Sequence, residues 1–83
     1  MSAVPATAPP AVESRRAVLE SMMLRLFNIR CSELAGRVRA GFLPFVDAVD
    51  LAYEAAVWSG LCDLVGDDRV QVCMAEAFMG LRR

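Results

Sequence analysis

The feature that most constrains the fold is a proline-free run of helix-forming residues from position 12 or 13 to position 39. As a single helix this segment is about 38 Å long at 1.5 Å per residue, which exceeds the diameter of a small domain. Gly36 and Gly41 mark its end, and Pro44 suits the first turn of a second helix, where its missing N–H costs nothing. No alternating strand pattern and no internal repeat interrupts the helical periodicity. The sequence therefore predicts an all-α fold.

Two further helices are predicted after the long one, over residues 44–65 and from residue 67 or 68 to residue 81. Gly66 is placed as a left-handed terminator between them, and Asp67 or Asp68 caps the last helix. We expect a small three-helix bundle, in which the long helix packs on an antiparallel hairpin of the other two and a second copy could complete the bundle. The hairpin would place Cys62 near Cys73. Residues 1–12, rich in proline and alanine, are predicted to be a disordered tail, and residues 13–83 a single helical domain.

The apolar faces of the predicted helices differ in number. The last helix has one stripe, and the long helix has two faces together spanning about 240°. The helix over residues 44–65 is apolar nearly all round, with a ladder of small residues that allows close helix approach. The stripe of the last helix consists of Val70, Cys73, Met74, Ala77, Phe78 and Leu81. One face of the long helix carries Leu19, Met22, Leu26 and Ile29, and the other carries Met23, Phe27, Cys31, Leu34 and Val38. The ladder of small residues consists of Ala48, Ala52, Ala56 and Gly60.

The chain thus has more apolar surface than a three-helix monomer of 83 residues can cover, and the excess predicts a protein interface. The candidate interface residues are Met22, Leu26 and Ile29 of the long helix with Leu51 and Trp58 of the second helix. Trp58 and Tyr53 are the candidate aromatic anchors, although a core position is favoured for each. A tight monomer with single apolar residues scattered on its surface is the alternative.

Carboxylates at positions 47, 50 and 54 form one narrow row on the second helix. Asp47, Asp50 and Glu54 are expected to be a solvated stripe, with an ionic contact to Arg30 or Arg37 as the alternative. Metal binding by the row is disfavoured because carboxylate bundles that bind iron add a histidine, and this chain contains none.

Composition excludes several classes of chemistry. The chain has no histidine and no lysine, and its nine basic residues are all arginine, against ten acidic residues. Histidine-based acid–base catalysis and Schiff-base chemistry are therefore absent, and we expect no enzyme activity, no cofactor and no metal. A net charge of −1 argues against bulk attraction to nucleic acid. Cys31, Cys62 and Cys73 are expected to be reduced and to pack as small hydrophobes.

The predicted location is cytoplasmic. No uncharged run is long enough for a membrane span, and residues 1–12 lack the pattern of a signal peptide. The use of arginine alone for positive charge, together with abundant alanine and valine, suggests a bacterial or phage gene.

The function we expect is a non-enzymatic protein–protein interaction module: a small regulator, adaptor or inhibitor whose partner is another protein or a second copy of itself. One alternative is a phage or mobile-element inhibitor of host machinery, of the anti-CRISPR type, which rests on size and fold class alone. The other is a small DNA-binding regulator. The spacing of Ala56 and Gly60 fits a helix-turn-helix, but the following helix would then begin with acidic residues where phosphate lies.

Overall fold

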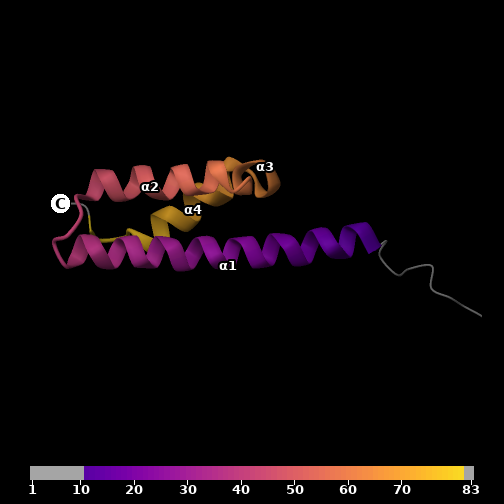
Figure 1. Cartoon of the computed structure of the whole chain (residues 1–83), viewed down its shortest axis with the longest axis horizontal. Helices are drawn as coiled ribbons and strands as arrows, with labels where there is room; N and C mark the ends of the chain where they lie inside the picture. Colours follow the sequence, from indigo (N-terminus) through magenta and orange to yellow (C-terminus); the bar gives the residue numbers. More distant parts are fainter. Residues whose placement is uncertain (1–10, 82–83) are drawn as a thin grey trace, which may run out of the picture.

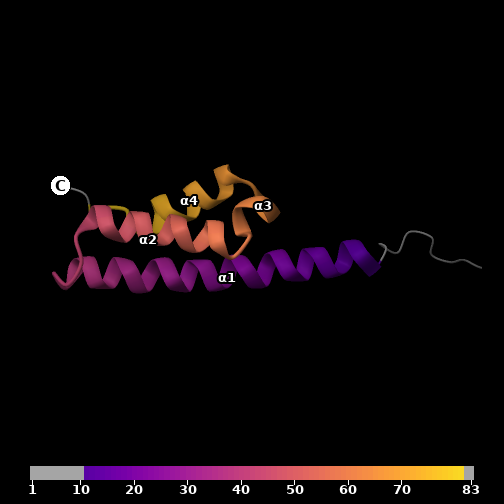
Figure 2. The same cartoon turned by 45° about the horizontal axis from the view of Figure 1, so that its top comes forward.

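A computed structural model describes residues 11–81, and in this range the chain is helical and contains no strand. The helices are α1 (Ala11–Arg39), α2 (Phe45–Trp58), α3 (Leu61–Val65) and α4 (Asp67–Ala77). Helix α1 forms one side of the molecule, and the three shorter helices, α2, α3 and α4, pack together against one face of it (Figures 1 and 2). The all-α prediction is confirmed.

The long first helix is confirmed with a small shift, since α1 begins at Ala11 and ends at Arg39. Its N-terminal end extends beyond the other helices (Figure 1). The predicted tail over residues 1–12 lies mostly outside the part of the chain that the structure describes, which begins at residue 11. After Arg39 the backbone N–H of Phe42 donates to the carbonyl of Arg37 at 2.9 Å and that of Gly41 to Val38 at 3.0 Å. These bonds form a Schellman motif around Gly41, whose φ of 81° favours glycine.

The prediction of a single helix over residues 44–65 is wrong, because the helix breaks at Ser59 and Gly60. Residues 11–81 therefore form four helices instead of the three predicted. Gly60 adopts a φ of 84°, which a helix cannot continue. The Ser59 hydroxyl donates to the carbonyl of Ala56 at 3.2 Å and accepts from the backbone N–H of Leu61 at 3.4 Å. The break redirects the chain so that Leu61 is buried in the core. Gly60 therefore terminates α2 and does not extend its small-residue ladder.

The last helix starts at Asp67, within the predicted range, but the predicted cap by Asp67 or Asp68 is wrong, because Gly66 is the N-cap and no side chain caps the helix. Helix α4 ends at Ala77, four residues before the predicted end at Leu81. Gly66 before it has φ 94° and ψ 150°, a conformation almost restricted to glycine, so α3 and α4 are separated by a sharp corner. Phe78 remains buried and Leu81 packs against the core in the turns that follow α4. The apolar periodicity therefore continues although the helix does not.

The core forms where α1, α2 and α4 meet. Ala48, Ala52 and Ala56 of α2 are fully buried, which lets α2 approach its neighbours closely. One face of α1 and the stripe of α4 close around this ladder, and the rings of Phe45 and Phe78 meet edge to face at 6.1 Å. The buried residues of α1 and α4 in this cluster are Phe27, Cys31, Leu34, Ala35, Val70 and Met74.

Candidate protein-interaction surface

Helix α1 buries one of its two apolar faces and exposes the other. The face containing Phe27, Cys31 and Leu34 lies in the core. The opposite face remains on the surface, with side chains 48% to 63% exposed. We call this face the outer stripe; its members are Val18, Leu19, Met22, Leu26 and Ile29. Met22, Leu26 and Ile29, which the sequence proposed as interface residues, are thus brought together on one exposed line.

The outer stripe adjoins α2. A hollow of about 180 Å³ lies between the two helices, with Leu26 and Arg30 on the α1 side and Ala55 and Ser59 on the α2 side. Leu51 and Trp58 flank Ala55 at helical spacing, which places them on the same side of α2. Both are exposed, Leu51 by 39% and Trp58 by 86%. The five candidate interface residues therefore lie on neighbouring exposed faces of α1 and α2.

The sequence favoured a core position for Trp58 and for Tyr53, and this prediction is wrong because both side chains are exposed. The physical reason is the early end of α2, which leaves Trp58 as its last residue. No α2 turn follows that could cover the indole ring. Its neighbour Val57 is likewise exposed.

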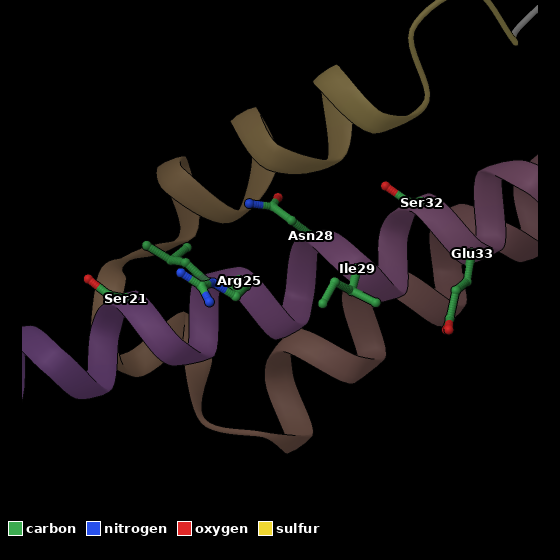
Figure 3. Close-up of a pocket in the computed structure, with 7 residues that line it drawn as sticks. Ser21, Arg25, Asn28, Ile29, Ser32 and Glu33 are labelled. Atoms are coloured by element: carbon green, nitrogen blue, oxygen red, sulfur yellow. The ribbon is translucent and has the colours of Figure 1, made fainter.

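The other margin of the outer stripe is more polar. A shallow hollow of about 730 Å³ runs along α1 beside it. Figure 3 shows Ser21, Asn28 and Ser32 along one edge of this hollow, and Ile29 and Glu33 along the opposite edge. The outer stripe therefore has the apolar hollow of α2 on one flank and hydrogen-bonding groups on the other.

The predicted acidic row is exposed along its length at Asp47, Asp50 and Glu54. Within residues 14–81, whose side chains are described, Arg30 pairs with Glu33 at 3.6 Å, and no ion pair joins the row to Arg30 or Arg37. The same part of the chain contains no group of three or more acidic or cysteine side chains arranged to hold a metal ion. As charged contacts for a partner, these residues remain predictions.

Two contacts between helices were missed by the sequence reasoning. The Tyr53 hydroxyl donates to a carboxylate oxygen of Asp67 at 2.9 Å, which ties α2 to the start of α4. This hydrogen bond and the charge of Asp67 raise the pKa of Tyr53. The guanidinium of Arg16 donates to the carbonyl oxygen of Leu64 at 3.3 Å and to Glu20 at 3.1 Å. Both contacts depend on the break at Gly60, and the sequence predicted a continuous helix through this residue.

The three cysteines are free thiols. Burial, with a smaller effect of Cys73, raises the pKa of Cys31 to about 11, so this thiol is neutral at physiological pH. Burial and the nearby carboxylate of Asp67 also raise the pKa of Cys62. All three pack in or against the core, as expected of small hydrophobes. The proximity of Cys62 to Cys73 stays a prediction.

No family model, curated protein or solved structure matches this chain. None of the helices described within residues 11–81 combines the length and the apolar character that crossing a membrane requires.

Proposed function

We propose that this protein is a non-enzymatic protein–protein interaction module that acts by binding a protein surface through its apolar helix faces. The observation that carries the proposal is the outer stripe of α1, where five large apolar side chains are about half exposed or more in one continuous row. Apolar residues scattered singly on a surface are ordinary, but a contiguous exposed row is typical of an interaction site.

The neighbouring flank of α2 extends this surface. Trp58 is the most exposed of the large apolar residues, and tryptophan is the residue type most enriched among interface anchors. Met22 adds a flexible thioether that adapts to the shape of a partner. The lack of histidine and lysine in the sequence supports a binding role over a catalytic one.

In-cell photo-crosslinking tests the proposal. A photoreactive amino acid replaces Leu26 in one variant and Trp58 in another, in the cells that naturally carry the gene. Glu76, an exposed residue on α4, is the matched control position. We expect adducts of discrete mass from positions 26 and 58 and none from position 76. Equal background at all three positions would contradict the proposal.

A further inference from the structure

Four of the five residues of the outer stripe of α1, from Leu19 to Ile29, have the same spacing when they are read from either end, and Val18 lies outside this pattern. Met22 lies three positions after Leu19, and Ile29 lies three positions after Leu26. These four residues are therefore symmetric about the midpoint between Met22 and Leu26. Two such stripes that lie antiparallel stack in matching layers, each Leu19 against the partner's Ile29 and each Met22 against the partner's Leu26, which is the geometry of a two-fold contact.

Opposite charges close the two ends of the stripe. Arg15 lies four residues before Leu19, and Glu33 lies four residues after Ile29. Both are exposed, and their separation from Met22 and Leu26 by seven residues keeps them on the same face of the helix. Antiparallel pairing of two α1 helices brings Arg15 of each copy beside Glu33 of the other. Among the residues that the structure describes, Glu33 pairs only with Arg30, at 3.6 Å, which is longer than a hydrogen bond.

The position of the stripe leaves room for a second helix. It lies on the side of α1 away from the core residues Phe27 and Leu34, so the shorter helices of both copies remain on the outside. The N-terminal end of α1 also extends past those helices (Figure 2). An α1 pair from residue 15 to residue 33 is about 28 Å long. A contact of this size favours a weak dimer with a micromolar dissociation constant.

We propose that a second copy of this chain covers the outer stripe, with the two α1 helices antiparallel and Arg15 of each copy paired with the partner's Glu33. The inference rests on the proposed function, because it names the partner of that surface. It leaves Trp58 and Leu51 of α2 outside the paired stripe.

Charge reversal measured by sedimentation equilibrium tests the pairing. Arg15→Glu places two carboxylates together at both ends of the dimer, and Glu33→Arg places two guanidinium groups together. Each single variant is expected to weaken dimerisation about tenfold at low ionic strength, and less at high salt. The double variant Arg15→Glu/Glu33→Arg restores opposite charges and is expected to return to within about threefold of the original dissociation constant.

Arg25→Glu is the matched control. Arg25 lies beside the midpoint of the stripe, so the two copies of this residue face each other across the two-fold axis. The substitution exchanges one like-charged pair for another, with the same change in net charge as Arg15→Glu, and is expected to leave dimerisation within about threefold. Leu26→Asp, which places a charge in the stripe, is expected to abolish the dimer. Circular dichroism confirms that each variant is folded.

A wild-type protein that stays monomeric up to millimolar concentration would overturn the inference. A dimer that the single charge reversals do not weaken, or that the double variant does not restore, would overturn it as well. Crosslinked adducts at position 26 with a different protein, together with a monomeric purified chain, would overturn the self-pairing but leave the proposed function standing. Absence of both the dimer and the adducts would overturn both.

Discussion

Replacing Leu34 with alanine is expected to lower the free energy of unfolding by roughly 2–5 kcal/mol, because the substitution removes buried methyl groups and leaves a cavity. Leu34 is 0% exposed and lies at the centre of the α1 face that packs into the core. A domain this small has a total stability of only about 5 kcal/mol or somewhat more, so much of the native population is lost. Urea denaturation followed by circular dichroism at 222 nm, the usual helix wavelength, measures the change.

Leu26→Ala is the control for this experiment, since it deletes the same atoms from the other face of α1. Leu26 is 63% exposed, and its truncation is expected to change the free energy of unfolding by less than about 0.5 kcal/mol, provided that the urea series is run on dilute, monomeric protein. Similar losses for the two variants would mean that the assignment of core and surface faces on α1 is wrong.

Ala52→Leu is expected to lower the free energy of unfolding by roughly 1–3 kcal/mol or more, because a larger side chain has no space between closely packed helices. Ala52 is 0% exposed in the middle of the small-residue ladder of α2. The added methyl groups must push α2 away from its neighbours or force strained rotamers. Thermal unfolding followed by circular dichroism measures the loss.

Ala55→Leu makes the same chemical change one turn along the same helix and serves as the control. Ala55 lines the hollow of about 180 Å³ beside Leu26 and Arg30, so the larger side chain has space there. We expect this variant to be within about 0.5 kcal/mol of the original protein. Equal destabilisation by both substitutions would contradict the packing of the ladder.

The helical periodicity in the sequence was sufficient to predict the long α1, the all-α class and the start of α4. It also separated the two apolar faces of α1, because residues at 3.6-residue spacing share a direction whatever they contact. The face proposed as the interface, with Met22, Leu26 and Ile29, is the exposed one, but periodicity alone does not determine which face is buried. That choice depends on where α2 and α4 pack, and both faces offer comparable side chains, with Leu34 on one and Leu26 on the other.

The break at Gly60 was missed because glycine has two roles in helical sequences. After Ala48, Ala52 and Ala56, Gly60 continues a ladder of small residues, and the same residue can also terminate a helix with positive φ. Ser59 immediately before it was the available signal, since its hydroxyl bonds to the backbone on both sides of the turn. The hydrogen bond from Tyr53 to Asp67 follows from this break, so it could not be predicted from a continuous helix.

The end of α4 was overestimated for a related reason. Phe78 and Leu81 keep the apolar period of the helix, and both pack against the core from irregular backbone. The period therefore reports which residues face the core but not whether the chain between them is helical. Gly80, with a φ of 79°, was the signal for the earlier end.

Trp58 offers a direct test of whether the flank of α2 that extends the outer stripe carries large apolar side chains on the surface, because it is the single tryptophan of the chain and is 86% exposed. The measurement is acrylamide quenching of its fluorescence in dilute Leu26→Asp protein, where self-association does not interfere. We expect native protein to emit at nearly the wavelength of urea-unfolded protein and to be quenched almost as efficiently. A blue-shifted native emission that acrylamide quenches poorly would show Trp58 in the core and contradict the exposed surface on which the proposed function depends.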